Sequence, residues 1–463
     1  MLAEFIEYSQ WLFLIYFIGL NFAYMLLNIA AIFSVSKYMG EKTLTNIPGI
    51  DSEIMLPVTL LVPAYNEENT ITKSIHALLQ LEYPEYEIVI VNDGSNDDTL
   101  TRLKSDFNLQ EFPEAYRKRL ETQDIKQTYV SRDHPRIRVI DKVNGGKSDA
   151  LNAGINVSRY PLVCVVDADS ILQRDSLKRV VQPFLFDNRT VVSGGTVRIV
   201  NGSIVEKGHI SQTSTPTHIL PLIQVVEYLR AFLFGRLGWS PLNALLIVSG
   251  AFGVFHKETL ISVGGYKTDT IGEDMELIVR IHRKLRAAKK PYRITFVPDP
   301  VCWTEAPEDF KTLANQRIRW QRGLCESLFN NLSLFMNPRA GAVGMLAFPF
   351  MMFFEWAGPF IEVVGLIIIV MGFLAGLIDL QVFLLLMFVA TMFGMMLSVT
   401  ALLLEEISFH MYQKPKDLLR LFFAAIIENF GYRQMNSVFR IIGFYHWLFN
   451  TKRSWGSMKR KGL

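Results

Sequence analysis

Acidic side chains follow the ends of two apolar runs, where they could bind a metal ion or a polar substrate. Asp93 follows the run at 88–91, and Asp167 and Asp169 follow the run at 162–166. In open α/β sheets ligands bind outside the carboxyl ends of the strands, so we expect these carboxylates to line one crevice. Asp167 and Asp169 are alternate residues and can direct two oxygen ligands at one Mg²⁺ or Mn²⁺, whose other ligands are water and substrate phosphates.

A turn-and-cap role is the structural alternative for these acids, since an Asp after a strand often caps the next helix. It applies well to Asp93, which stands in an Asn-Asp-Gly-Ser sequence at 92–95. At 167–169 a cap accounts for one carboxylate but not for two.

Two later groups of residues offer a candidate general base and a candidate binding face. Glu273 and Asp274 open a predicted helix, where the helix dipole alone favours acids and the functional alternative is a general base. Gln316, Arg319 and Trp320 share one face of another predicted helix at i, i+3 and i+4. An amide, a guanidinium and an indole suit a diphosphate and a stacked sugar, whereas a Trp-Arg belt at a membrane interface is the alternative.

The Gly-Gly-Lys-Ser run at 145–148 resembles the end of a phosphate-binding P-loop. The full pattern needs a glycine at the position that Asp141 occupies, so the motif is incomplete. Lys147 either meets a phosphate or base from this glycine-flexed loop or is a solvated lysine at a helix start.

The elements that must position these residues alternate between strand and helix. Apolar runs at 58–62, 137–140 and 162–166 precede amphipathic stretches at 67–81, 147–157 and 173–184. This alternation predicts an α/β, doubly wound, mostly parallel sheet buried on both faces. The run at 88–91 precedes a long polar region that we expect to be helical, and 201–221 is predicted to be a loop.

The composition excludes some classes of protein. Of 463 residues, 50% are hydrophobic, and 47 basic residues nearly balance 44 acidic ones. The net charge of +3 gives no case for nucleic-acid binding. The three cysteines cannot form a disulfide framework and lack metal-ligand spacing, so a reducing compartment is expected. The mean hydropathy of +0.22 is high for a purely soluble enzyme.

The apolar residues gather in membrane-length segments. Residues 11–33 exceed the roughly 20 residues that a span needs. Lys37 and Lys42 follow this segment, which predicts an outer amino terminus and a cytosolic chain from about residue 40. The predicted parts are an amino-terminal transmembrane helix (1–40), a cytosolic domain (41–336), and carboxyl-terminal interfacial and transmembrane helices with a basic tail (337–463).

The carboxyl-terminal part is predicted to cross the membrane twice, near 360–378 and 382–404. An interfacial or kinked helix at 343–357 precedes these spans, and 418–427 and 438–449 are expected to be interfacial. Two alternatives remain open for Glu355 and Glu362, which either face protein or a wet cavity at membrane depth or lie at the interface.

Taken in chain order, these motifs resemble those of the membrane-integrated, processive members of glycosyltransferase family 2, which include synthases of cellulose, hyaluronan, chitin oligosaccharides and poly-N-acetylglucosamine. The resemblance covers roughly residues 56–330. It rests on Pro-Ala-Tyr-Asn-Glu-Glu at 63–68, Asn-Asp-Gly-Ser at 92–95, Gly-Gly-Lys at 145–147, Asp-Ala-Asp at 167–169, Ser-Gly-Ala-Phe-Gly at 249–253, Gly-Glu-Asp at 272–274 and Gln-Arg-Ile-Arg-Trp at 316–320.

The resemblance implies a GT-A-like fold and a role for each matching residue. Ala64, Tyr65, Glu67 and Asp93 would surround the nucleobase and ribose, with Lys147 nearby; Asp167 and Asp169 would hold the metal and diphosphate; Asp274, beside Glu273, would be the general base; Gln316, Arg319 and Trp320 would hold the diphosphate and the acceptor sugar; Ser249 and Gly250 would shape the acceptor end.

The implied activity is metal-dependent, inverting transfer of a sugar from a UDP-sugar to a growing β-linked polysaccharide, coupled to its translocation across the plasma membrane. A poly-N-acetylglucosamine-like product is the first expectation. A small membrane partner subunit or a homo-oligomer would complete a channel. The alternatives are a non-processive family-2 enzyme that adds one sugar to a lipid carrier or glycolipid, and a transporter with a nucleotide-sensing domain.

Overall fold

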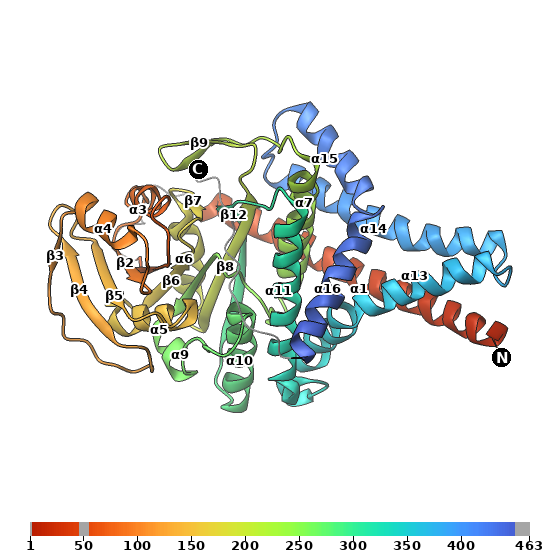
Figure 1. The fold of residues 1–463 in the computed structure, drawn as a ribbon, viewed down its shortest axis with the longest axis horizontal. Helices are drawn as coiled ribbons and strands as arrows, with labels where there is room; N and C mark the ends of the chain where they lie inside the picture. The colour runs from red at the N-terminus through yellow and green to blue at the C-terminus, as the bar shows by residue number, and fades with distance from the viewer. Residues whose placement is uncertain (1, 46–54, 450–463) are drawn as a thin grey trace.

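The chain forms a mixed β-sheet with helices on both faces and a group of long helices that project to one side (Figure 1). The computed structural model describes residues 2–45 and 55–449. The α/β fold expected from the sequence is confirmed, but the sheet is mixed rather than mostly parallel, because five of its nine neighbouring strand pairs are antiparallel. The sheet has ten strands in the order β3-β4-β5-β2-β1-β6-β11-β8-β12-β7.

The centre of the sheet is parallel. β5 (Ile137–Lys142), β2 (Tyr86–Asn92), β1 (Val58–Ala64) and β6 (Leu162–Val166) run in one direction. These strands are almost wholly buried, which explains their continuous apolar runs. Since all four end at the same edge, the loops that carry Asp93 and Asp167 meet there.

Beyond β6 the sheet becomes mixed. β11 (Phe252–His256) runs antiparallel to β6 and to β8 (Thr190–Ile199), and β8 runs parallel to β12 (Arg293–Thr304). β7 (Ile171–Leu172) completes this edge. The loop that leads into β11 therefore lies beside the end of β6, because the start of one strand meets the end of its neighbour in an antiparallel pair.

Helices cover the two faces and the ends of the sheet. Those of the globular part are α3 (Ile71–Leu78), α4 (Thr99–Asp106), α5 (Lys147–Val157), α6 (Ser176–Phe186), α7 (Ile219–Leu229), α8 (Leu237–Trp239), α9 (Lys257–Ser262), α10 (Glu273–Ala287) and α11 (Phe310–Phe329). A π-helical segment, η1 (Arg230–Arg236), joins α7 to α8.

Two regions differ from the sequence prediction. The polar region after β2 contains the short helix α4 and then β3 (Leu109–Glu111) and β4 (Ile125–Ser131), so it is not one long helix. Residues 201–221, predicted to be a loop, contain a hairpin of β9 (Ile204–Glu206) and β10 (His209–Gln212). Strands this short carry too few alternating residues to give a period.

Long apolar helices project away from the sheet (Figure 1). In the described part of the chain two segments are long and apolar enough to cross a membrane, Glu4–Gly40 within α1 (Leu2–Thr45) and α14 (Leu380–Ser408). Val343–Trp356 and α13 (Gly358–Leu374), which meet at a bend of 41°, form a third candidate if they are one span.

Two amphipathic helices come last in the described part of the chain, and they lie where interfacial segments are predicted. α15 (Pro415–Ile427) packs against α7 and α14, and α16 (Tyr432–Leu448) packs along α11 and α13. One continuous apolar core includes residues of α1, the sheet and the membrane-length helices.

Candidate active site

The loops after β1 and β2 are joined where the sequence places the nucleotide. The Asp93 amide donates to the Ala64 carbonyl at 2.9 Å. The Glu67 amide donates to the Thr99 hydroxyl at 2.9 Å. Tyr65 leaves 47% of its surface exposed beside them, so its ring is available to a planar group.

Asp93 is committed to the glycine loop beneath this surface. One carboxylate oxygen accepts the Gly145 amide at 3.0 Å and the other accepts the Gly146 amide at 2.7 Å. Lys142, fully buried, lies 2.5 Å from Asp93 and 2.5 Å from Asp149. Asp93 thus fixes the loop that presents Lys147. This contact is a turn-stabilising role, and a direct role of Asp93 in nucleotide binding stays a prediction. The buried pair of Lys142 and Asp149 could not be predicted from the sequence, because a buried charged pair leaves no periodic pattern of residue types.

Lys147 joins the two acidic groups. Its ammonium lies 2.6 Å from Asp167 and 3.3 Å from Glu273, and it donates to the Gly250 carbonyl at 3.3 Å. Burial alone would lower the pKa of Lys147, but the carboxylates outweigh it and raise that pKa above its ordinary value. Burial raises the pKa of Glu273.

Asp274 lies next to Gly250, whose carbonyl accepts the hydrogen bond from Lys147. A methyl group added to Gly250 would lie 3.3 Å from Asp274 Oδ2. The same loop reaches the aspartate turn, since the Asp167 amide donates to the Ala251 carbonyl at 3.3 Å, and Ser249 accepts the Ala251 amide at 3.2 Å. The loop at 249–251 therefore brings the turn after β6 and the start of α10 to one place.

Asp167 and Asp169 both lie half-buried in the turn between β6 and β7. The Ser74 hydroxyl donates to the carbonyl of Ala168 between them, which ties the turn to α3. Among the residues that the structure describes, no three His, Cys, Asp or Glu side chains gather to hold a metal by themselves. A cation here would take its remaining ligands from substrate oxygens and water.

The start of α10 and the helix α11 meet at two glycines. This contact places Asp274 close to α11, which carries Gln316, Arg319 and Trp320. A methyl group on Gly272 would lie 2.7 Å from the Gly323 Cα, so the two backbones are in contact. Glu326 reinforces the crossing by accepting the Ile271 amide at 2.7 Å and the Thr270 hydroxyl at 2.8 Å. A bulkier residue at either glycine would separate the helices.

The three side chains predicted to share a face of α11 differ in how far they are exposed. Gln316 is 8% exposed, and its side-chain oxygen has no hydrogen-bond partner among the described residues. Trp320 is 44% exposed, and Arg319 is half-buried. Arg317, which was not singled out from the sequence, stacks 4.3 Å from the centre of the Trp320 ring and pairs with Glu227 at 2.7 Å.

Arg236 is a second residue that sequence reasoning missed. It ends the π-helical segment η1, donates to the Val248 carbonyl at 2.6 Å, and stacks 3.8 Å from the Phe232 ring. Burial lowers the pKa of Arg236 to about 10, against the attraction of Asp274. A π-helical turn is often found at functional sites, but this one is visible only in the structure and not in the sequence.

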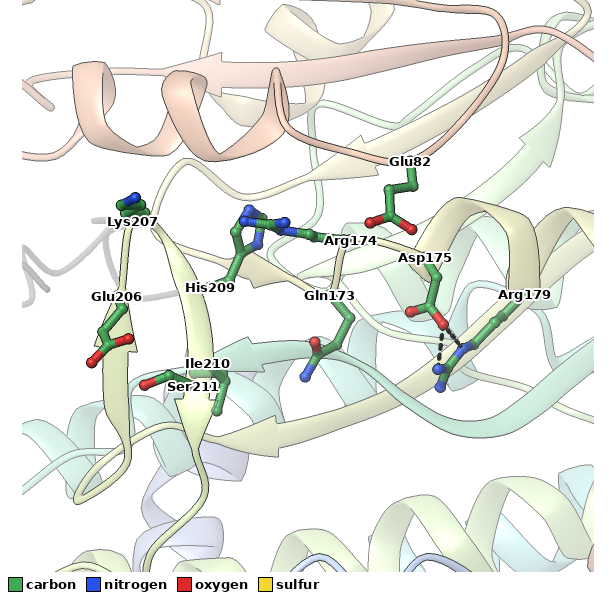
Figure 2. Close-up of a pocket in the computed structure, with 10 residues that line it drawn as sticks. All are labelled: Glu82, Gln173, Arg174, Asp175, Arg179, Glu206, Lys207, His209, Ile210 and Ser211. Carbon is green, nitrogen blue, oxygen red and sulfur yellow. Dashed lines mark hydrogen bonds and ion pairs between the residues drawn. The ribbon is translucent and has the colours of Figure 1, made fainter.

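A separate cavity of about 590 Å³ lies between the β9–β10 hairpin and the start of α6 (Figure 2). Its walls carry both signs of charge, among them Arg174, Lys207 and Glu82, and an ion pair of Asp175 with Arg179 crosses one side. None of the residues predicted for the active site lines this cavity, so it is distinct from the cluster around Lys147.

Matches to known families agree with this geometry. Residues 59–238 match the model of glycosyl transferase family 2, and residues 162–399, just over half of the chain, match that of glycosyl transferase family group 2. This chain belongs to glycosyl transferase family group 2. The matched residues include the aspartate turn, the loop at 249–251, and the helices α10 and α11.

Two similar curated proteins carry the same name. The chain is 31% identical over 308 residues to a poly-beta-1,6-N-acetyl-D-glucosamine synthase of Staphylococcus aureus strain MSSA476, covering 66% of this chain and 64% of the synthase. It is 30% identical over 275 residues to the Staphylococcus epidermidis synthase of the same name, covering 59% of this chain and 56% of that protein. The matched part thus spans less than two thirds of these relatives.

A solved structure shares the fold. The mannosyltransferase PcManGT from Pyrobaculum calidifontis, in complex with GDP-Man and Mn²⁺, superposes with a TM-score of 0.55 at 18% identity, over 94% of this chain and 100% of that chain.

Proposed function

We propose that this chain is an inverting glycosyltransferase that transfers a sugar from a UDP-sugar to the end of a growing β-linked polysaccharide. The observation that carries the proposal is the meeting of Lys147, Asp167, Glu273 and Asp274 around Gly250. The relatives' names favour N-acetylglucosamine as the sugar.

Each part of the cluster has a task in this proposal. Tyr65, Glu67 and the loop fixed by Asp93 hold the nucleoside, and Lys147 neutralises phosphate charge. Asp274 accepts the proton of the acceptor hydroxyl as that oxygen attacks the anomeric carbon from the face opposite the nucleotide. A single displacement inverts that carbon, so an α-linked donor gives a β-linked product. General-base assistance typically contributes about 10²–10⁴-fold.

Mg²⁺ or Mn²⁺ fits the aspartate turn. Asp167 and Asp169 offer two carboxylates in a half-buried turn, the number that Mg²⁺ usually takes from protein when a diphosphate supplies further oxygens. Bound there, the cation would stabilise the negative charge that develops on the leaving diphosphate.

The acceptor is proposed to lie against α11. Gln316 offers an unpartnered buried oxygen, Arg319 offers a cation, and Trp320 offers a half-exposed ring for sugar stacking. The membrane-length helices beside α11 favour a polymer that leaves through the plasma membrane, with the catalytic part cytosolic and with a partner subunit or a second copy completing the path.

The test is a panel of UDP-sugars incubated with the purified full chain and Mg²⁺ or Mn²⁺. Release of UDP with UDP-N-acetylglucosamine, and a product digested by a β-1,6-specific glycosidase, would support the proposal. One sugar on a lipid carrier would instead support the non-processive alternative. No UDP release with any donor would overturn transferase activity and favour the transporter alternative.

A further inference from the structure

Two ion pairs tie α16 to the bent membrane-length segment. Arg433 lies 3.0 Å from Glu362, and Arg440 lies 3.1 Å from Glu355. The arginines are seven residues apart on one helix, and so are the glutamates on the other segment. Seven residues make about two α-helical turns, so both arginines lie on the face of α16 that meets the bent segment.

Both glutamates therefore contact protein groups, as one of the two alternatives left open by the sequence expects. Glu362 also accepts the Ser437 hydroxyl at 2.8 Å, and Glu355 accepts the Tyr24 hydroxyl of α1. Carboxylates at membrane depth are costly without such partners.

The two ion pairs differ in what else they hold. Arg440 also donates to the Gln321 side chain on α11 at 2.8 Å and to the backbone carbonyl of Glu355. Gln321 follows Trp320 directly and is 2% exposed. In the described part of the chain the Arg433–Glu362 pair has no hydrogen bond to α11.

Backbone contact reinforces the link between α16 and α11. A methyl group on Gly443 would lie 2.6 Å from the carbonyl oxygen of Ile318 and 2.9 Å from the Gln321 Cβ. Ile318 is the central residue of the Gln-Arg-Ile-Arg-Trp motif at 316–320. α16 thus touches the back of the segment whose other side carries Gln316 and Trp320.

We propose that Arg440 is a positioning residue that fixes the acceptor-binding segment of α11 relative to the bent membrane-length segment at Glu355. Its guanidinium connects α11, α16 and the bent segment at one point. It therefore fixes the position of the Trp320 ring relative to the bent segment. The inference rests on the proposed function, because it assigns α11 to the acceptor. A shift of about 1 Å at such a point can cost up to about 100-fold in rate.

The experiment compares Arg440→Gln with the matched control Arg433→Gln in the full chain in lipid nanodiscs. The readout is the ratio of polymer elongation to UDP-N-acetylglucosamine hydrolysis, which a uniform loss of folded protein does not change. We expect Arg440→Gln to lower the ratio by about 10–100-fold and Arg433→Gln to leave it unchanged. Equal ratios in the two variants would overturn the inference.

A second pair of variants covers the case in which Arg440→Gln does not fold. Gln321→Leu removes only the α11 side of the link and should lower the ratio in the same direction, whereas Gln321→Glu keeps an acceptor for Arg440 and should preserve it. A Gln321→Leu variant with the wild-type ratio would overturn the inference.

A distance measurement separates this inference from the proposed function. Spin labels at the exposed residues Asn315 on α11 and Leu374 on α13 report the relative position of these helices, and the native cysteines are buried. A broader distance distribution in Gln321→Leu than in Arg433→Gln supports the positioning role even if no donor is turned over. Identical distributions would overturn it, while absence of UDP release by the wild type would overturn only the proposed function.

Discussion

Gly272, at the start of α10, and Gly323, in the middle of α11, lie backbone against backbone. A methyl group on Gly323 would lie 2.8 Å from the Cα of Gly272, a distance that Cβ atoms do not adopt. The crossing has a functional consequence because Asp274 is two residues beyond Gly272, while Gln316 and Trp320 belong to the partner helix. In the proposed function, the distance between the general base and the acceptor face therefore depends on both of these residues being glycine.

Gly323→Ala is expected to destabilise the protein and to reduce transfer further than folding explains. Overpacking typically costs about 1–3 kcal/mol, and the shift moves Asp274 away from α11. Thermal unfolding and sugar transfer by the folded fraction are the measurements. Gly19→Ala is the control, since its new methyl would lie 3.9 Å from Phe354; equal behaviour of the two variants would contradict the argument.

Asp274→Asn is expected to retain nucleotide binding and to lose transfer by about 10²–10⁴-fold. The amide keeps the shape of the side chain beside Gly250 but cannot accept the hydroxyl proton at neutral pH. UDP binding by calorimetry and UDP release from the donor check the two halves. Turnover at the wild-type rate would remove Asp274 as the base.

Lys147→Met is expected to weaken UDP binding by about tenfold or more, as loss of a charge-assisted hydrogen bond typically does. The same change should strengthen Mn²⁺ binding without nucleotide, because the ammonium 2.6 Å from Asp167 no longer competes with the cation. Titration of Mn²⁺ by electron paramagnetic resonance measures the second effect. Lys126→Met, at an exposed position of β4, is the control; weaker Mn²⁺ binding in Lys147→Met would argue against competition.

Trp320→Ala is expected to impair elongation more than hydrolysis of the UDP-sugar. The residue is 44% exposed and one face of its ring is stacked on Arg317, so the exposed part offers a surface to an acceptor sugar. Product length on gels and UDP release by water give the two rates. An equal loss of both would count against acceptor stacking.

Stability should fall as the pH drops from about 6.5 to 4, owing to His282. Burial lowers the pKa of this imidazole from 6.5 to about 4, and its nitrogens contact the Tyr292 hydroxyl at 2.6 Å and the Leu245 carbonyl at 2.8 Å. In that window the unfolded chain binds the proton first, so the contribution is intact above the unfolded pKa and decreases below it by roughly 3 kcal/mol.

Thermal unfolding of wild type and His282→Gln across this range measures the effect. The wild type should lose stability toward pH 4 more steeply than the variant. Parallel curves would show that other groups dominate the acid response.

The sequence predicted the parts of the fold that rest on periodicity and on strand ends. Buried parallel strands such as β1 and β6 appear as apolar runs, and the acids that follow them meet at one edge because parallel strands end together. The face of α11 followed from helical spacing alone.

Contacts between distant segments had no local signature. The commitment of Asp93 to the amides of Gly145 and Gly146, the buried pair of Lys142 with Asp149, and the hydrogen bond from Arg236 to the Val248 carbonyl depend on the packing of separate elements. The roles of the predicted residues toward a substrate remain predictions.

The long helix α1 is held at two distant points. Tyr38 donates to Asp299 in β12, and Tyr24 donates to Glu355, while Leu27 and Val35 share one apolar core with the central strands. The expected boundary at residue 40 therefore separates segments that are packed as a single folding unit. A chain that began after residue 40 would expose this core surface and leave Glu355 and Asp299 each without a tyrosine donor, so the enzyme is best produced and studied with α1 attached.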